Sequence, residues 1–229
     1  MMYKKIVDGI FIKRPNRFIA HVLINGEEEI AHVKNTGRCK ELLIPGAKVV
    51  LEDCSHIKDR KTKYSLIAVW KGNMLVNMDS QVPNRVVFEA LKENKIEGLE
   101  DLIHIEREVT YGNSRYDIYF ESKKEKGFIE VKGVTLEIDG ISMFPDAPTE
   151  RGRKHVLELI EAVKDGYKGV VLFLIQMKGP RKFRPNWEMD GKFSQAVRLA
   201  YENGVNILAY DSIVTENNIT LGEKRKVDL

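Results

Sequence analysis

The sequence predicts a small all-β barrel followed by an α/β domain with a mixed sheet flanked by helices, and three observations lead to this prediction. Short alternating apolar and polar stretches, separated by turns, fill residues 1–80. Helical and strand patterns alternate through residues 81–229. The change falls just before Pro83, a residue type that is favoured in the first turn of a helix. We therefore expect two domains, at residues 1–80 and 81–229.

The first 80 residues carry the signals of consecutive β-hairpins. Residues 17–24 place apolar side chains at every second position, and Asn25 and Gly26 then form the strongest short-range signal for a tight hairpin turn. About five strands within one small domain favour an OB-like barrel. We expect these strands at residues 17–24, 28–33, 47–51, 64–70 and 74–77.

The remaining residues follow the order helix, strands, helix, strand, helix, strand. The helix expected at 149–164 has Thr149 as its N-cap and Gly166 beyond its end. The nearly continuous apolar run at 169–176 is typical of a strand buried on both faces. This order gives an α/β domain with at least one parallel connection. The other expected features are strands within 105–120, 127–136 and 205–210, a helix with Phe193, Val197, Ala200 and Tyr201 on its core face, a loop at 181–184 and a loose charged tail after Thr220.

The composition argues against several classes of protein. No apolar run is long enough to span a membrane, and no apolar stretch follows Lys4 and Lys5 as it would in a signal peptide. Cys39 and Cys54 are the only cysteines, which supports neither a disulfide framework nor a zinc site. We expect a cytoplasmic protein with no membrane partner.

The charge of the chain is uneven along its length. The whole sequence has 37 Lys and Arg against 34 Asp and Glu, a net charge of +3. Residues 1–80 hold 14 of the basic and 9 of the acidic residues, a net charge of +5, which leaves −2 for the remainder. A basic front is what a polyanion-binding module would show, although charge alone leaves a chance fluctuation open.

Three charged residues gather on one predicted hairpin. Side chains alternate between the two faces of a strand, so Tyr116, Ile118 and Phe120 should share the buried face and Asp117 should lie on the other face. In the next strand Glu130 and Lys132 share the polar face. Two registers are open, one with Asp117 across from Lys132 and one with Asp117 across from Glu130.

This trio is suited to metal-assisted phosphodiester chemistry. Mg²⁺ or Mn²⁺ is commonly held by one or two carboxylates, here Asp117 and Glu130, with water and substrate phosphates completing the shell. Lys132 could orient the attacking water or neutralise charge on the phosphate. The alternative is a solvated hairpin face with a weak ion pair, because Asp, Glu and Lys at this spacing form a loose pattern.

Longer motifs around these residues resemble a known family. The stretches 112–117, 130–136 and 144–155, together with 35–38 in the front module, are similar to those of the sugar fermentation stimulation protein A family. The resemblance covers about residues 5–215. It implies an OB-like domain and a domain similar to the PD-(D/E)xK, restriction-endonuclease-like superfamily.

The resemblance also implies residue roles and activities. The superfamily's motif residues map onto Asp117, Glu130 and Lys132, and Glu89 lies where many members place an additional acid. Tyr116 stands where the superfamily name has its proline. The family is described as DNA-binding, with a proposed nuclease activity and an older proposed role in regulating sugar metabolism.

Several basic residues are candidates for nucleic-acid contacts. Helix N-termini and arginines both bind phosphate, which favours the start of the helix after Thr149, whereas a capped, exposed first turn is the alternative. Basic barrel loops bind single strands in proteins of this kind, although a solvated loop is the default for any charge run. The candidates are Arg17, Arg38, Lys40, Lys61, Arg115, Arg151, Lys154 and Arg181, and Gln176 at the end of a buried strand is a candidate for orienting water or a base.

Three functional hypotheses follow from the sequence. The first is a Mg²⁺- or Mn²⁺-dependent nuclease acting on DNA or RNA. The second is a largely sequence-independent DNA-binding protein or regulator without turnover. The third assigns the two acids to a structural ion only. A homo-oligomer remains open in all three.

Overall fold

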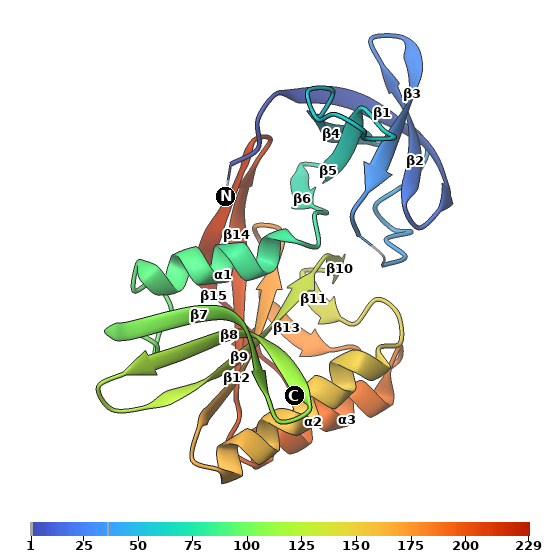
Figure 1. Ribbon diagram of the computed structural model, residues 1–229. Coiled ribbons are helices and arrows are strands. Elements are labelled where there is room, and N and C mark those ends of the chain that lie inside the picture. Colours follow the sequence, from blue (N-terminus) through green and yellow to red (C-terminus); the bar gives the residue numbers. More distant parts are fainter. Residues whose placement is uncertain (1, 36) are drawn as a thin grey trace.

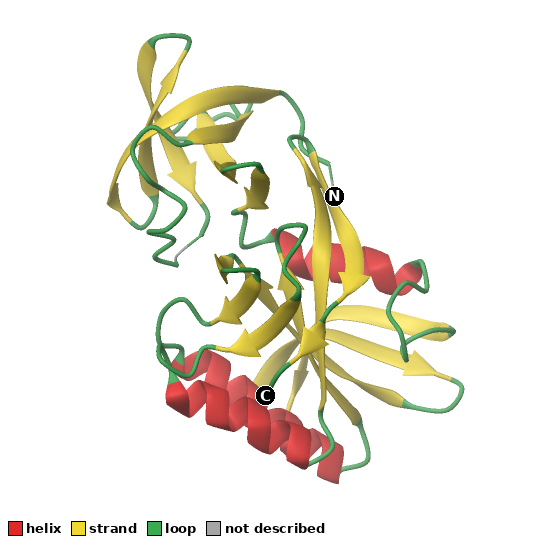
Figure 2. Ribbon diagram, turned by 180° about the vertical axis from the view of Figure 1, so that it is seen from behind, coloured by secondary structure: helices red, strands yellow, loops and turns green. Residues whose placement is uncertain are grey.

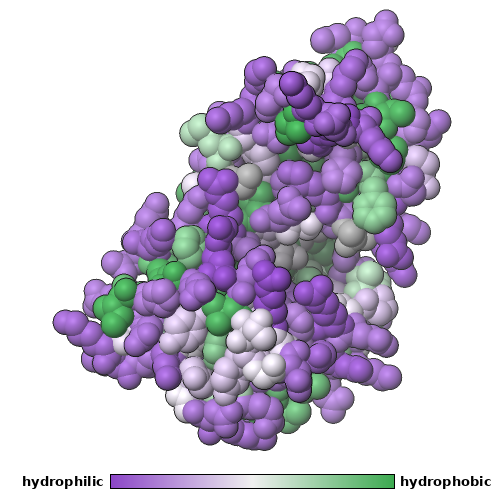
Figure 3. All heavy atoms as spheres, viewed as in Figure 1, coloured by the Kyte–Doolittle hydropathy of each residue, from purple (hydrophilic) through white to green (hydrophobic). Residues whose placement is uncertain are grey.

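The computed structural model describes residues 2–35 and 37–229, which form a β-barrel seated on an α/β domain (Figure 1). Both predicted parts of the fold are confirmed. Within the described residues no helix is long and apolar enough to cross a membrane. The face seen in Figure 3 is covered mainly by hydrophilic side chains over both parts.

The front part is a closed five-stranded barrel. Its strand order is β3-β2-β1-β4-β5, and a parallel pairing of β3 with β5 closes it, while β6 is attached to β5. Asn25 and Gly26 have φ angles of 50° and 90°, as a two-residue hairpin turn requires, and they join β2 and β3 as predicted. The strands are β1 (Ile6–Asn16), β2 (Ile19–Ile24), β3 (Glu27–Val33), β4 (Lys48–Asp53), β5 (Tyr64–Lys71) and β6 (Met74–Asn77).

The second part is built on a six-stranded mixed sheet with the order β15-β14-β12-β9-β8-β7. Its central strand β12 is parallel to both β9 and β14, whereas the outer pairings are antiparallel. A smaller sheet has the order β10-β11-β13-β16. The helices are α1 (Val82–Lys92), α2 (Glu150–Lys164) and α3 (Gly191–Glu202). The strands are β7 (Leu102–Tyr111), β8 (Ser114–Ser122), β9 (Lys126–Val134), β10 (Leu136–Ile138), β11 (Ile141–Phe144), β12 (Lys168–Ile175), β13 (Lys182–Pro185), β14 (Asn206–Thr215), β15 (Asn218–Lys224) and β16 (Lys226–Val227).

Helices cover both faces of the large sheet (Figures 1 and 2). Val170, Leu172 and Leu174 of β12 join one core cluster with α1, and the alternate residues Val171 and Phe173 join the cluster that contains α2 and α3. Both faces of β12 are therefore buried, which explains its continuous apolar sequence. The N-cap prediction is also confirmed, since the Thr149 side chain accepts a hydrogen bond from the Gly152 N–H at 3.1 Å.

Three predictions about exposure and local order are wrong, and two of them fail because of pairing with distant residues. The strands expected within 105–120 are present as a hairpin that turns at Gly112 and Asn113, but Tyr201 on α3 is 60% exposed rather than in the core. Residues 182–185 form β13 rather than a loop because they pair with β11. The charged tail is ordered because β15 pairs with β14 and Arg225 forms an ion pair with the fully buried Asp211.

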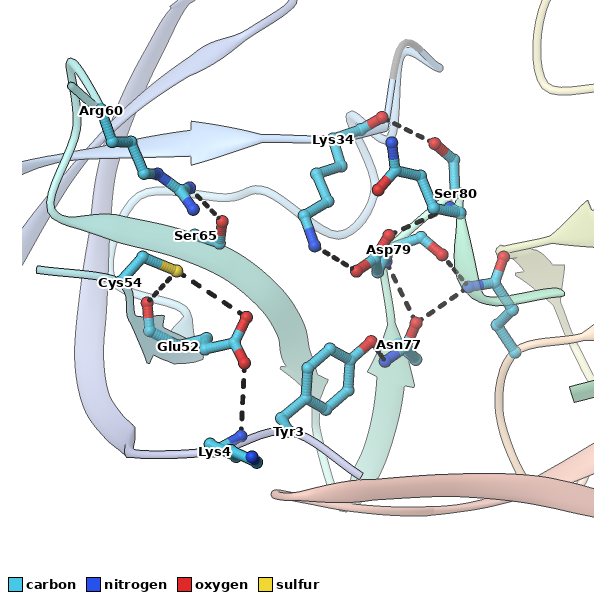
Figure 4. Close-up of polar contacts among 12 residues, drawn as sticks. Tyr3, Lys4, Lys34, Glu52, Cys54, Arg60, Ser65, Asn77, Asp79 and Ser80 are labelled. Carbon is cyan, nitrogen blue, oxygen red and sulfur yellow. Dashed lines mark hydrogen bonds and ion pairs between the residues drawn. The ribbon is translucent and has the colours of Figure 1, made fainter. Parts of the chain in front are cut away.

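A buried polar network joins the barrel to the α/β domain (Figure 4). Lys34 Nζ at the end of β3 lies 2.7 Å from Asp79 Oδ2, and Asn77 Nδ2 donates to the Tyr3 hydroxyl at 2.9 Å. From the other domain, Gln176 Nε2 donates to Asn77 Oδ1 at 2.9 Å and to the Asp79 carbonyl at 3.1 Å. Directional bonds from three separate segments meet here, so they fix the orientation of one domain on the other.

The ends of the chain add a second junction. The backbone N–H of Tyr3 donates to the Asn217 carbonyl at 2.8 Å, and Met2 forms a β-bridge with Asn218. The long hairpin of β14 and β15 thus reaches up beside the first residues (Figure 1). Lys71 Nζ of the barrel also donates to the Glu137 carbonyl at 2.6 Å.

We expect Lys34→Met to lower the free energy of unfolding by about 3–5 kcal/mol, because Asp79 would keep a buried carboxylate without its charge partner. The Asp79 side chain is only 1% exposed, against 19% for Lys34. Urea denaturation followed by circular dichroism measures the change. The matched control is Lys63→Met, whose 3.6 Å ion pair with Glu29 is exposed and should contribute under about 1 kcal/mol. Equal losses in the two variants would contradict the importance of the buried pair.

Candidate active site

The register between β8 and β9 settles how the predicted trio is arranged. The paired residues run from Glu121 with Lys126 to Ile118 with Ile129, where the ladder ends. Extending this register by one residue sets Asp117 opposite Glu130, which is one of the two arrangements that the sequence left open. Asp117 is therefore the first residue of β8 beyond the paired part of the strand.

The strand β8 changes its facing at Asp117. Tyr116 packs against Phe128, with ring centroids 4.9 Å apart, in the cluster that contains α2 and α3. Ile118 and Phe120 instead join the cluster with α1. The prediction that Tyr116 shares a face with Ile118 and Phe120 is wrong, because regular alternation is interrupted between them.

Asp117 occupies the gap that opens between the two strands. Its Oδ2 accepts the backbone N–H of Val131 at 2.8 Å, so the carboxylate takes a hydrogen bond from the neighbouring strand. Its Oδ1 accepts from Asn84 Nδ2, in the first turn of α1, at 2.6 Å. Both oxygens are thereby oriented by groups that are fixed in a strand and a helix.

Glu130 lies on the α2 side of the sheet. Its register partner in β12 is Val171, which belongs to the core beneath α2 and α3. Glu130 Oε1 receives two hydrogen bonds, from Lys132 Nζ at 2.5 Å and from His155 Nδ1 at 2.8 Å. The Glu130 side chain is 3% exposed, whereas that of Lys132 keeps 14%. The carboxylate is thus shielded while the ammonium reaches toward the surface.

The second oxygen of Glu130 is different from the first. Glu130 Oε2 is buried and has no hydrogen-bond partner among the residues that the structure describes. An orphaned carboxylate oxygen is costly unless something else satisfies it. A bound cation, or a water molecule that donates a hydrogen bond, would satisfy this oxygen.

The two acids have pKa values shifted in opposite directions. Burial and the negative charge of Glu130 raise the pKa of Asp117 above its usual range, and the bonds from Val131 and Asn84 only partly offset this. Burial also acts to raise the pKa of Glu130, but the hydrogen bond from His155 and the charge of Lys132 outweigh it and hold this pKa below its usual range. Glu130 is therefore the firmly ionised member of the pair.

The donor set fits a hard divalent cation. Carboxylate oxygens are the ligands that Mg²⁺, Mn²⁺ and Ca²⁺ prefer, and Mg²⁺ often takes only one or two from the protein. In residues 2–35 and 37–229, no group of three or more His, Cys, Asp or Glu side chains that could hold a metal ion is found, so the protein offers only these two carboxylates. A cation at Asp117 and Glu130 would hence keep positions for water and substrate oxygens.

The additional acid is not brought to this site. Glu89 forms an ion pair with Arg85 at 2.8 Å and lines a small cavity with Thr220 and Leu221 of β15. The residue of α1 that reaches Asp117 is Asn84. The helical position implied by the resemblance therefore points to another surface in this chain.

The predicted basic residues are spread over several surfaces. Arg17 and Arg38 line a cleft between the two domains, while Lys40 and Lys61 are exposed on the barrel. Arg115 pairs with Glu108. In the first turns of α2, Arg151 is exposed and Lys154 Nζ donates to the Asn113 carbonyl at 3.4 Å; Arg181 donates to the Asp139 carbonyl at 3.0 Å.

Sequence reasoning missed two residues of the site, Asn84 and His155, and the role of a third. Asn84 and His155 reach the acids from helices on opposite faces of the sheet, so only the packing of those helices reveals them. His155 could have been found from the sequence, because it lies one turn inside a helix that the order of strands and helices already predicts to pack on the sheet. Gln176 was a candidate for orienting water, but its amide is used between the domains.

Models of two protein families match this chain. The model described as the sugar fermentation stimulation protein RE domain matches residues 81–218, and the model of the SfsA N-terminal OB domain matches residues 12–78.

Similar proteins cover nearly the whole chain. A sugar fermentation stimulation protein homolog of Alkaliphilus oremlandii is 64% identical over 232 residues, covering 100% of this chain and 99% of its own. Another from Clostridium botulinum strain Loch Maree is 54% identical over 99% of this chain and 98% of its own. The structure of Pyrococcus furiosus SfsA in complex with Ca²⁺ superposes with a TM-score of 0.90 at 28% identity, covering 100% of this chain and 98% of that one.

We expect Asp117→Asn to stabilise the protein near pH 7 in the presence of EDTA. Because the pKa of Asp117 is raised on folding, its contribution to stability is present below the unfolded-state pKa and is lost as pH rises through the folded-state pKa. The asparagine removes this titration, so the gain should vanish near pH 3, where the carboxyl group is protonated in both states. Urea denaturation at several pH values measures it.

The matched control for this substitution is Asp139→Asn at an exposed turn, which should change little at either pH. Its φ of 51° is one that asparagine tolerates. An Asp117→Asn variant that is less stable than the parent near pH 7 would contradict the prediction.

Proposed function

Because this chain belongs to the sugar fermentation stimulation protein family, we propose that its second domain is a divalent-metal-dependent phosphodiesterase acting on DNA or RNA. The observation that carries the proposal is the gathering of Asp117, Glu130 and Lys132 where the ladder of β8 and β9 ends. A solvated hairpin face would leave these groups exposed, but Glu130 is buried with one oxygen unpaired. Such an arrangement is costly for the fold and is typical of functional sites.

Asp117 and Glu130 would be the residues that hold the ion, and Glu130 Oε2 has no hydrogen-bond partner among the described residues. When bound, such an ion would polarise a phosphoryl oxygen and make a water molecule more acidic. Mg²⁺ and Mn²⁺ suit carboxylate ligands. The Ca²⁺ complex of the Pyrococcus furiosus relative supports a divalent cation in this fold.

The chain's own groups position the reaction. His155 holds Glu130 Oε1, so Oε2 keeps one direction. Asn84 and the Val131 N–H do the same for Asp117. Lys132 can neutralise the negative charge that builds up on the phosphate, or it can orient the attacking water through a hydrogen bond. The buried floor beneath Glu130 excludes bulk water and strengthens these interactions.

The barrel would contribute grip on the polyanion. Its sequence carries the net positive charge of the chain, and we place the division between the two functional units at residues 80 and 81. Both cysteines are free and buried, which supports a reducing compartment such as the cytoplasm.

A nucleic-acid binder without turnover is the second candidate, and the +5 charge of residues 1–80 favours it independently of the trio. It predicts salt-sensitive binding and no product with Mg²⁺ or Mn²⁺ on any substrate. A purely structural ion predicts instead that metal raises the free energy of unfolding without either binding or cleavage depending on Lys132.

We expect Asp117→Ala and Lys132→Ala each to lower metal-dependent cleavage by about a hundredfold or more, because each removes a group that acts on the transition state. Cleavage is measured with purified protein on labelled single-stranded and duplex DNA and RNA, with Mg²⁺ or Mn²⁺. Binding measured in EDTA should stay within about threefold, since neither residue lies in the barrel.

Glu121→Gln and Lys123→Ala are the matched controls for these variants. They remove the same charges from the same hairpin at its opposite end, away from Asp117. Full cleavage by both site variants would overturn the proposed activity. Loss of cleavage in the controls as well would show that the hairpin, and not the trio, is responsible.

A further inference from the structure

A cleft of about 480 Å³ lies between the barrel and the α/β domain. One wall comes from the barrel and from the segment that follows β6. The other wall comes from the segment before α2 and from the ends of β9 and β12. The barrel-side residues are Arg17, Asn35, Gly37, Arg38 and Ser80, and those on the other side include Gly133, Thr135, Asp146, Ala147, Thr149 and Gln176.

The cleft adjoins the candidate active site. Gly133 in its wall directly follows Lys132, and it lies three residues, roughly 10 Å along an extended strand, from Glu130. Gln176 directly follows the end of β12, so the cleft opens at the carboxyl ends of two parallel strands. Ligands of open α/β sheets bind at that edge.

The two domains approach each other closely where Gly37 and Arg38 face Asp146. A Cβ atom on Gly37 of the barrel would lie within 2.8 Å of Asn35 Oδ1 and closer still to Asp146 of the α/β domain. Within the α/β domain, a Cβ on Gly133 would lie 2.5 Å from Gln176 Oε1, so the ends of β9 and β12 are tightly packed there. The Arg38 N–H donates to Asp146 Oδ2 across the interface at 2.8 Å. With the Lys34 and Asp79 network behind it, the gap has little freedom to widen.

Two arginines, Arg17 and Arg38, make the entrance of the cleft positively charged. Arg14 organises both, because its guanidinium donates to the carbonyls of Arg17 and Arg38 at 2.7 and 3.1 Å, and also to those of Asn35 and Gly37. The side chains of Arg17 and Arg38 remain exposed. Asp146 is the one acid among the described lining residues, and its Oδ2 is already bonded to the Arg38 N–H.

We infer that this cleft seats one or two nucleotides of a single strand, with Arg17 and Arg38 on its phosphates, and that the site therefore acts on single-stranded rather than duplex nucleic acid. The inference rests on the proposed function. A cavity of this size holds a drug-sized molecule, whereas a duplex presents two strands across a 12 Å major groove. A strand leaving the cleft past Gly133 meets Lys132 first and then the two acids.

Binding by charge-removal variants tests the inference. Arg17→Ala/Arg38→Ala should weaken binding of a labelled DNA or RNA single strand of about eight nucleotides at least tenfold, measured by fluorescence anisotropy in EDTA. The slope of log K against log salt should fall by about 1.4, which corresponds to two lost phosphate contacts. Separate DNA and RNA arms show which strand the cleft prefers.

The matched control is Arg107→Ala/Arg198→Ala, which removes the same charge from exposed positions outside the cleft. It should change the affinity less than about threefold. Ala147→Trp adds bulk within the cleft at constant charge and should also weaken single-strand binding at least tenfold. Circular dichroism and urea midpoints confirm that each variant is folded.

Equal effects of the two double variants, or normal single-strand binding by Ala147→Trp, would overturn the inference. Duplex binding that is as tight as single-strand binding, and that depends as strongly on Arg17 and Arg38, would also overturn it.

Failure of the proposed function is recognised separately. If the parent cleaves no substrate but the binding results are as expected, the cleft stands as a single-strand site without catalysis. If the parent cleaves and Arg17→Ala/Arg38→Ala cleaves with unchanged KM, the cleft inference alone fails.

Discussion

The hydrogen bond from the Val131 N–H to the Asp117 carboxylate is the constraint on which the site depends. It stands where the next rung of the β8–β9 ladder would be, so one side chain satisfies a backbone donor and ends the pairing in the same place. The divergence turns Tyr116 toward α2 while Ile118 stays on the α1 side. In a regular antiparallel pair, directly opposed residues share one face of the sheet, so helices on opposite faces could not each reach one of these two acids.

From this divergence the sheet acquires supports on both faces. Asn84 reaches Asp117 from α1, and His155 reaches Glu130 from α2. The opposite pKa shifts of the two acids follow from these unequal surroundings. The His155 and Lys132 side chains outweigh the burial of Glu130, whereas the groups around Asp117 offset its burial only in part. A cation between them would relieve the repulsion that now raises the pKa of Asp117.

Local chemistry made much of this predictable from the sequence. Turn residues and strand alternation located Asp117, Glu130 and Lys132, and the apolar run of β12 located the centre of the sheet. The details that escaped prediction depend on contacts between distant segments. The charged tail is ordered because β15 pairs with β14 and Arg225 pairs with buried Asp211. The residue of α1 that contacts Asp117 is Asn84, whereas Glu89 lies against β15. No spacing within a single segment encodes such contacts.

The bond between the Tyr3 N–H and the Asn217 carbonyl has a consequence for how the protein is made. Synthesis proceeds from the N-terminus, and domains fold as they emerge. The barrel can therefore close long before its anchor on the β14–β15 hairpin exists. The relative orientation of the two domains is completed only near the end of translation, so a ribosome-bound chain carries a finished barrel over an unfinished cleft.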